Sequence, residues 1–335
     1  MNNLNRSLLC AIASLSLLLS GCSPTLNSNL LSIKSVQAVN RTVNINDPSF
    51  NEQWTIFHTK SNEAWKILSQ KKQVRVAVVD TGVDYNHPDL KNRVLKNLGY
   101  NFINNSRDAM DDNWHGTHVA GIIAAEAGNN VGVTGIVGDA DVKIIPVKVM
   151  DENGNGSSDI IAQGIRYGAD VGADIINFSI GFGVKDKYIE EAIKYARSKG
   201  VLVIVSSGND NLNCDSSSPA SDEGAYTVAS VNSYDEKSDF SNYGTSVNIA
   251  APGEGILSTV PGEGYEYRDG TSMAAPIVVG VAAMIKAENP NLSPEEIENI
   301  LNKSAGDIME KGKDTSTGYG LINAYEAVKL AKSIL

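Results

Sequence analysis

Four polar side chains of the types used in hydrolysis stand in short, glycine-containing segments of the chain. Asp80 lies in VAVVDTGVD, His115 begins HGTHVAG, Asn209 lies in SSGND, and Ser272 lies in GTSMAAP. An imidazole can take the proton of a serine hydroxyl, a carboxylate can orient that imidazole, and an amide can bind an oxyanion. Aspartate, histidine, serine is one of the chain orders in which this triad occurs. The four segments together predict acyl transfer through a serine.

Each of these residues also has an ordinary structural explanation. Asp80 or Asn209 could form a turn after a strand, and His115 or Ser272 could cap a helix. A metal site at His115 and His118 is a weaker alternative, because the metalloprotease pattern places two histidines at i and i+4 with a glutamate between them. The agreement of four segments favours catalysis.

The elements that position these residues follow from alternating β-branched and amphipathic runs. This alternation predicts an α/β fold, a mostly parallel sheet with helices on both faces. A ligand site is then expected beyond the carboxyl ends of the strands, where Asp80 and Asn209 fall. Strands are expected at 75–79, 143–150, 174–181, 201–208, 227–231 and 247–253, and helices at 118–127, 159–172, 188–200, 271–285, 293–301 and 321–332.

The four segments resemble the signature segments of the subtilisin-like serine proteases, the subtilases, and the loop lengths resemble thermitase-like enzymes. The resemblance covers residues 46–328 and implies a three-layer α/β/α fold and a serine endopeptidase that acts on proteins or peptides. It implies that Ser272 is the nucleophile, His115 the general base and Asp80 the carboxylate that orients it. The Asn209 amide and the backbone N–H of Ser272 would bind the oxyanion.

The resemblance also implies where the substrate binds. An extended peptide would pair with one edge of the site, and the primary pocket would be roomy and mildly polar. Trp114 departs from the family, in which a small residue precedes the histidine; it either narrows a subsite or packs on the surface. The implied substrate-binding residues are Ser179, Ile180, Gly181, Ser207 and Gly208, with Ser217 near the pocket floor and Asp210 near its rim.

A structural calcium ion is a further implication, because the loop at 126–133 has the length of the thermitase-like calcium loop. Its oxygen donors suit Ca²⁺, which takes 6–8 oxygen ligands. The alternative is that the two aspartates cap a loose terminus and a turn. The implied ligands are the side chains of Asp47, Asp89 and Asn129 and the backbone carbonyls of Glu126, Val131 and Val133.

A second calcium site of the family would lie near Asn101, Asn104 and Ser106, which have lost the expected carboxylates. We expect this second site to be weak or empty. Three aspartates nearby could compensate in part: Asp108, Asp111 and Asp112.

The N-terminal residues predict export. An apolar stretch, LLCAIASLSLLL, ends in Leu-Ser-Gly-Cys22, which resembles a bacterial lipobox, although an ordinary signal peptide is the alternative. We expect a lipoprotein signal peptide at 1–21, a tether or vestigial pro-segment at 22–46 and a peptidase domain at 47–335. A folded inhibitory pro-domain does not fit in so short a segment. The protein would lie outside the cytoplasmic membrane, anchored through lipid on Cys22 or released by clipping.

Composition limits the other partners. The formal net charge of −11 at pH 7 makes a nucleic-acid partner unexpected, because phosphate binding needs a basic face. Of the three cysteines, Cys10 would leave with the signal and Cys22 would carry lipid, so that Cys214 has no intramolecular partner. We expect a monomer.

Two other functions are compatible with the same sequence. One is an enzyme that matures a single peptide or surface protein, which would carry the same motifs as a broadly acting endopeptidase. The other is a catalytically silent binding protein on this scaffold, which the presence of all four functional residues disfavours.

Overall fold

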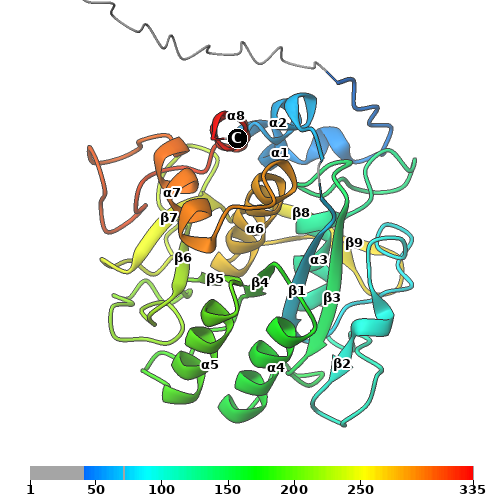
Figure 1. Cartoon of the computed structure of the whole chain (residues 1–335), viewed down its shortest axis with the longest axis vertical. Helices are drawn as coiled ribbons and strands as arrows, with labels where there is room; N and C mark the ends of the chain where they lie inside the picture. Colours follow the sequence, from blue (N-terminus) through cyan, green and yellow to red (C-terminus); the bar gives the residue numbers. More distant parts are fainter. Residues whose placement is uncertain (1–40, 71, 335) are drawn as a thin grey trace, which may run out of the picture. The chain divides into compact units, whose positions relative to one another are not determined.

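A seven-stranded parallel sheet forms the centre of the computed structural model, which describes residues 41–70 and 72–334. The strand order is β2-β3-β1-β4-β5-β6-β7, and every pair of neighbours in it is parallel (Figure 1). A separate antiparallel hairpin pairs β8 with β9. The strands are β1 Val74–Asp80, β2 Tyr100–Asn101, β3 Val142–Lys148, β4 Ile175–Phe178, β5 Leu202–Ser206, β6 Ala225–Val231, β7 Val247–Pro252, β8 Ile256–Val260 and β9 Gly264–Arg268.

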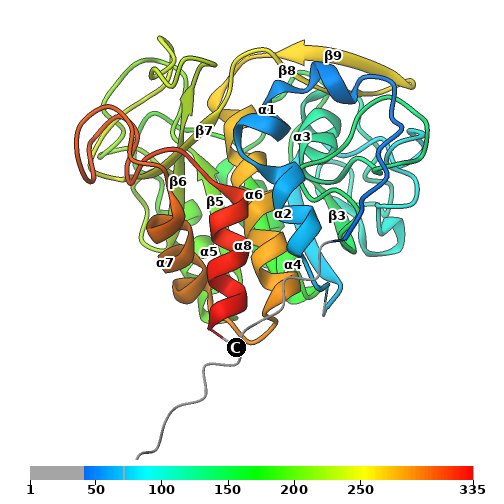
Figure 2. The ribbon, with the colours of Figure 1, turned by 90° about the horizontal axis from the view of Figure 1, so that it is seen from above.

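Helices cover both faces of this sheet, so that the expected three-layer α/β/α fold is confirmed. Helices α4 and α5 pack on one face, and α3, α6, α7 and α8 lie on the other, with α2 beside α8 (Figures 1 and 2). The helices are α1 Trp54–His58, α2 Ser61–Ile67, α3 His115–Ala124, α4 Ser158–Asp170, α5 Lys187–Ser198, α6 Thr271–Glu288, α7 Pro294–Ser304 and α8 Ala324–Ser333, with short 3₁₀ turns at Phe50–Glu52 and Lys96–Leu98.

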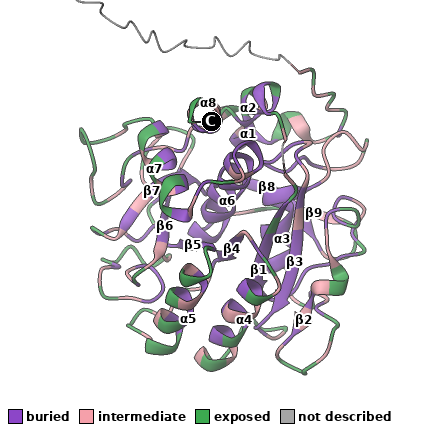
Figure 3. Cartoon of the chain, viewed as in Figure 1, coloured by how far each residue is buried: buried purple, intermediate pink, exposed green. Residues whose placement is uncertain are grey.

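The strands read as continuous apolar runs because both of their faces are buried. In β1, Val76 and Val78 point to the face covered by α3 and α6, whereas Ala77 and Val79 point to the face covered by α4 and α5. Figure 3 shows the result as buried strands between helices whose outer sides are exposed.

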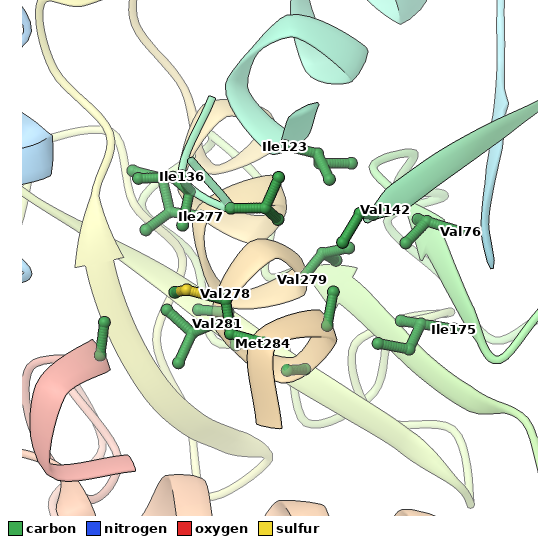
Figure 4. Packing of buried hydrophobic residues seen from close by; sticks show 14 of the residues in the cluster. Val76, Ile123, Ile136, Val142, Ile175, Ile277, Val278, Val279, Val281 and Met284 are labelled. Carbon is green, nitrogen blue, oxygen red and sulfur yellow. The ribbon is translucent and has the colours of Figure 1, made fainter. Parts of the chain in front are cut away.

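Helix α6 is the buried central helix of the layer formed by α3, α6, α7 and α8. Its residues Ile277, Val279 and Met284 pack among side chains of the sheet and of α3 (Figure 4). It is long and apolar enough to span a membrane, but 94 % of it is buried inside the protein, as in the core helix of a globular domain. Pro276 lies inside this helix, which begins at Thr271.

The predicted boundaries differ from the observed ones at the ends of two elements that border the site. Helix α3 begins at His115, three residues before the expected helix, so that the histidine stands at the helix start. Strand β4 ends at Phe178, three residues before the expected strand end, which leaves residues 179–181 outside the sheet.

The segment 41–46, expected within the tether, packs against the domain. Arg41 donates from its backbone N–H to Lys66 O at 2.8 Å, and its guanidinium pairs with Asp139. Asn130 N–H donates to Asn46 Oδ1 at 3.0 Å. The packed part of the chain therefore starts before the expected boundary at residue 47.

Candidate active site

Asp80 and His115 meet where strand β1 ends and helix α3 begins. His115 Nδ1 lies 2.8 Å from Oδ1 and 2.9 Å from Oδ2 of the fully buried Asp80. Thr81 N–H donates to Asp80 Oδ1 at 2.7 Å, so the carboxylate is also held by the backbone. A proton on Nδ1 satisfies this pair and leaves the lone pair on Nε2, which is the tautomer that a general base needs.

The close approach of α3 to β1 depends on the glycine after the histidine. A Cβ atom on Gly116 would lie 2.0 Å from the carbonyl oxygen of Gly82 and 3.1 Å from Cβ of Asp80. Any larger residue would push the helix start away from the strand and stretch the Asp80–His115 pair.

The pKa values of the two histidines of α3 are shifted in opposite directions. Burial opposes the charged form of His115, but the charge of Asp80, its hydrogen bond and the charge of Asp111 outweigh burial and raise the pKa of His115. Burial lowers the pKa of His118 to about 4. His118 Nε2 lies 3.0 Å from the carbonyl oxygen of Glu266, so a neutral His118 ties α3 to β9.

Ser272 is the second residue of α6, and the alternative that it caps this helix is wrong. Gly270 holds the cap position with φ 149°, a conformation that favours glycine. Ser272 is 9 % exposed, and its hydroxyl donates to Ser179 O at 3.1 Å. No hydrogen bond joins Ser272 to His115 in the part of the chain that the structure describes, but both line one cleft of about 500 Å³. Catalytic hydrogen bonds are often long before substrate binds.

Asn209 presents a free amide donor beside Ser272. Its Oδ1 accepts hydrogen bonds from Thr271 N–H at 2.9 Å and from Thr271 Oγ1 at 2.8 Å. This fixes the side chain with Nδ2 turned away from Thr271, and Nδ2 donates to no described residue. The backbone N–H of Ser272, in the first turn of α6, also has no acceptor among residues 41–70 and 72–334. Two donors therefore face the same cleft, as an oxyanion site requires.

The structure brings the expected substrate-binding residues into this one cleft. They line it together with the catalytic candidates, and the backbone of residues 179–181 is not used in the sheet. The lining residues that we expected are Ser179, Ile180, Gly181, Ser207, Gly208, Asp210 and Ser217.

Asn242 is a positioning residue that the sequence motifs did not indicate. Its Nδ2 donates to Ser207 O at 3.0 Å, and its Oδ1 accepts from Asp210 N–H at 3.0 Å and Leu212 N–H at 2.9 Å. It therefore holds the segment that carries Asn209. The surrounding residues, SNYGT, carry no recognisable catalytic pattern, and only the three-dimensional contacts assign this role.

Trp114 combines features of the two roles that we expected as alternatives, because it packs against neighbouring side chains and also lines the cleft. Its ring centroid lies 5.4 Å from that of His115 and 6.2 Å from that of His118, and the Arg268 guanidinium stacks 4.2 Å above it. It also lines the cleft beside the histidine.

Asp47 and Asp89, two of the expected calcium ligands, are buried against the same loop. Asp47 accepts hydrogen bonds from the backbone N–H groups of Gly128 at 2.9 Å and Asn129 at 3.0 Å. Asp89 accepts from Asn129 Nδ2 at 2.7 Å and from Val133 N–H at 3.0 Å. Asn129 therefore contacts both carboxylates.

The oxygen atoms around these carboxylates fit a hard cation. The carbonyls of Glu126, Val131 and Val133 accept no hydrogen bond from any described residue. Within the described ranges, neither aspartate pairs with a lysine or arginine, and no three or more His, Cys, Asp or Glu side chains are placed so that they could hold a metal ion by themselves. A cation here would therefore depend on amide and carbonyl oxygens as well as the two carboxylates, and Ca²⁺ accepts this mixture.

The three aspartates near the second family site have other partners. Asp108 accepts from the Tyr85 hydroxyl at 2.6 Å, and Asp112 pairs with Lys148 Nζ at 2.6 Å. Asp111 lies beneath the active site, where it accepts from Thr117 Oγ1 at 2.6 Å. Each of these three carboxylates therefore already has a partner within the protein.

Two of the three cysteines, including Cys22, lie outside the described residues. Cys214 is buried, and burial raises the pKa of its thiol to about 11. This thiol is therefore inert rather than nucleophilic.

The comparisons with known proteins agree with this geometry. The model of the subtilase family matches residues 71–320. The thermophilic serine proteinase of Bacillus sp. strain AK1 is 40 % identical over 320 residues, which cover 90 % of this chain and 78 % of that protein. Thermitase of Thermoactinomyces vulgaris is 38 % identical over 287 residues, which cover 85 % of this chain and 99 % of thermitase. A solved protease structure from Pseudoalteromonas arctica superposes with a TM-score of 0.78 and 34 % identity, covering 86 % of this chain and 99 % of the other.

Proposed function

Because the chain belongs to the subtilase family and is a subtilisin-like serine endopeptidase, we propose that Ser272, His115 and Asp80 are its catalytic triad. The observation that carries this assignment is the cleft lined by His115, Ser272 and Asn209, with the buried Asp80 hydrogen-bonded to His115. The relatives do not assign these roles to individual residues of this chain; the contacts of the site support them.

In the proposed reaction, Ser272 Oγ attacks the carbonyl carbon of the substrate while His115 Nε2 takes the hydroxyl proton. The tetrahedral intermediate collapses to an acyl-enzyme when His115 gives that proton to the leaving amine. Water then attacks the ester by the same route, and the acid product leaves. Asp80 keeps the proton of His115 on Nδ1 and stabilises the imidazolium in both steps.

Asn209 Nδ2 and the backbone N–H of Ser272 bind the oxyanion of each tetrahedral intermediate. Their geometry is fixed before the reaction, because Thr271 holds Asn209 and the helix start holds Ser272. Donors that need no reorganisation stabilise the transition state more than the ground state.

Substrates are proteins or peptides in an extended conformation. Residues 179–181 carry backbone groups outside the sheet, which an extended peptide can pair with as an added strand. The walls at Ser207 and Gly208 complete a polar primary pocket. These features favour broad cleavage over the maturation of one substrate.

Cleavage profiling tests the breadth of this activity. The purified protein is incubated with a denatured protein mixture, and the new N-termini are sequenced by mass spectrometry. We expect many internal cuts with a weak preference before the bond and none with the Ser272→Ala variant. Cuts confined to one sequence would instead support a dedicated maturation enzyme.

We propose that the loop at 126–133 holds a structural calcium ion. Asp47, Asp89 and the Asn129 side chain would bind it with the carbonyls of Glu126, Val131 and Val133. Asn129 Oδ1 accepts from Val131 N–H at 2.8 Å and retains a second lone pair for a cation. When bound, the ion supplies charge compensation for two buried carboxylates; it takes no part in the bond cleavage.

Calcium removal should lower the melting temperature by roughly 5–10 °C, since a ligand at a hundredfold excess over Kd stabilises by about 2.7 kcal/mol. The measurement compares EGTA with millimolar calcium on the Ser272→Ala variant, which excludes autolysis. Asp89→Asn should remove most of this difference. Asp222→Asn, a control at another buried carboxylate, should retain it. Equal melting curves in EGTA and calcium, on a sample shown to start without calcium, would rule out the site.

We propose that residues 1–21 are a lipoprotein signal, that Cys22 carries lipid and that a tether joins it to a peptidase domain packed from about residue 41 onward. The sequence pattern at Cys22 supports this arrangement, which lies outside the described residues. The enzyme would then work as a monomer outside the cytoplasmic membrane, with no nucleic-acid partner.

Cys22→Ser should move the enzyme from the membrane fraction to the soluble fraction or block signal processing. Two acyl chains are needed for stable anchoring, so loss of the lipidated cysteine removes it entirely. The distribution of protease activity between sedimented and soluble fractions measures this, with Cys214→Ser as the matched control. An unmodified Cys22 in the mass spectrum of the membrane-bound wild type would contradict the anchor.

A further inference from the structure

Asp111 lies directly beneath the catalytic pair and has no role in the reaction described above. It is 5 % exposed, and its carboxylate accepts four hydrogen bonds. Oδ1 accepts from Thr81 Oγ1 at 2.9 Å and from Asn113 N–H at 2.9 Å. Oδ2 accepts from the backbone N–H of Thr117 at 3.0 Å and from its Oγ1 at 2.6 Å.

These four donors favour an ionised carboxylate. Thr81 Oγ1 itself accepts from Gly116 N–H at 3.0 Å, and Thr117 Oγ1 accepts from Asp84 N–H at 2.9 Å. Neither hydroxyl has another acceptor among the described residues, so both hydroxyl protons are directed at Asp111. A protonated Asp111 would face only donors on both of its oxygens.

The same contacts connect Asp111 to the triad. Thr81 follows Asp80 and donates its backbone N–H to the Asp80 carboxylate. Gly116 follows His115, and its N–H is held by Thr81 Oγ1. Asp111 therefore fixes both neighbours of the catalytic pair through one hydroxyl group.

The charges around His115 leave Asp111 without a cationic partner. Lys148 pairs with Asp112, and Arg268 pairs with Glu266, so each nearby basic side chain already has its own carboxylate. Within the described ranges Asp111 forms no ion pair. The charged and titratable groups around His115 are Asp80 at the end of β1, Lys148 at the end of β3, His118 on α3, Glu266 and Arg268 on β9, Asp111 and Asp112 before α3, and Asp210 across the cleft.

We propose that Asp111 is a positioning residue that holds the Asp80–His115 pair and acts as a second fixed negative charge on the imidazolium. This inference rests on the proposed triad. Burial raises the pKa of Asp111 and its four hydrogen bonds oppose this, while its charge contributes to the raised pKa of His115. A low-dielectric surrounding strengthens the interaction between the carboxylate and the imidazolium.

The test compares Asp111→Asn with Asp112→Asn, which removes the same charge one residue away at a half-exposed side chain. In Asp111→Asn, the acidic limb of the kcat/KM profile should move to lower pH by about half a unit to one unit, because the imidazolium loses a favourable charge. The plateau value of kcat/KM should fall roughly three- to tenfold, because the same favourable interaction with the imidazolium is lost in the transition state. In Asp112→Asn, the limb should stay in place.

Three results would overturn the inference. The first is a lower plateau in Asp111→Asn with an unmoved limb, which is the signature of a structural role alone. The second is an equal shift in Asp112→Asn, which would reflect net charge. The third applies even if Asp111→Asn does not fold: a ¹³C resonance of the wild-type Asp111 carboxyl at the shift of a neutral acid between pH 6 and pH 9. Failure of the triad itself is detected separately, as activity that survives Ser272→Ala.

Discussion

Replacing Ser272 with alanine should lower kcat by roughly a millionfold and leave the fold intact. The magnitude is that known for subtilisin, a member of the same family, when its serine is removed. The physical reason is the loss of the hydroxyl that, among the described residues, lies both at the start of α6 and in the cleft with His115. The change removes one oxygen atom, which forms a hydrogen bond to Ser179 O and to no other described residue.

The measurement is hydrolysis of a fluorogenic peptide with circular dichroism of the same samples. Thr271→Ser, one residue away, keeps a hydroxyl on Asn209 and serves as the matched control. We expect a folded, silent Ser272→Ala protein and an active control. Wild-type turnover by a folded Ser272→Ala protein would end the assignment of the nucleophile.

Replacing Asn209 with alanine should lower kcat by about 10²–10³-fold with little change in KM. This range is the one found for the corresponding amide in subtilisin. The loss falls on kcat because the oxyanion, and hence the full strength of the hydrogen bond, exists only in the transition state.

A second amide in the same cleft provides the control. Asn153 also lines the cleft, but its Nδ2 donates to Glu152 Oε1 at 3.3 Å and its backbone N–H donates to Asp151 Oδ1 at 2.9 Å. Asn153→Ala should leave kcat nearly unchanged. A rise in KM without a fall in kcat for Asn209→Ala would show that Asn209 binds the ground-state substrate instead.

The central sheet and its helices could be predicted because their apolar residues follow regular patterns along the chain. The β-branched runs such as 75–79 mark strands buried on both faces, and the amphipathic runs such as 188–200 mark helices with one buried side. The capping box of Ser293 and Glu296 at the start of α7 is another pattern that lies within a few residues of the chain. Local patterns of this kind need no long-range information.

The remaining parts of the site depend on contacts between distant segments. The hairpin β8–β9 brings Arg268 onto Trp114, and no periodicity in either segment predicts that stack. From the sequence, Asp111 was interpreted only as a possible additional calcium ligand. Its hydrogen bonds to Thr81 and Thr117 form only when the chain folds, and no sequence pattern indicates them. The positioning role of Asn242 could not be predicted for the same reason.

The proposed mechanism depends most on Ser272 being a nucleophile that His115 activates. Labelling with a fluorophosphonate probe followed by peptide mapping tests it directly, because the probe phosphonylates only an activated serine. We predict one equivalent of label per chain, located on Ser272, and none in the His115→Ala variant. A wild-type protein that cleaves peptides but carries the label on another residue, or carries none, would contradict the claim.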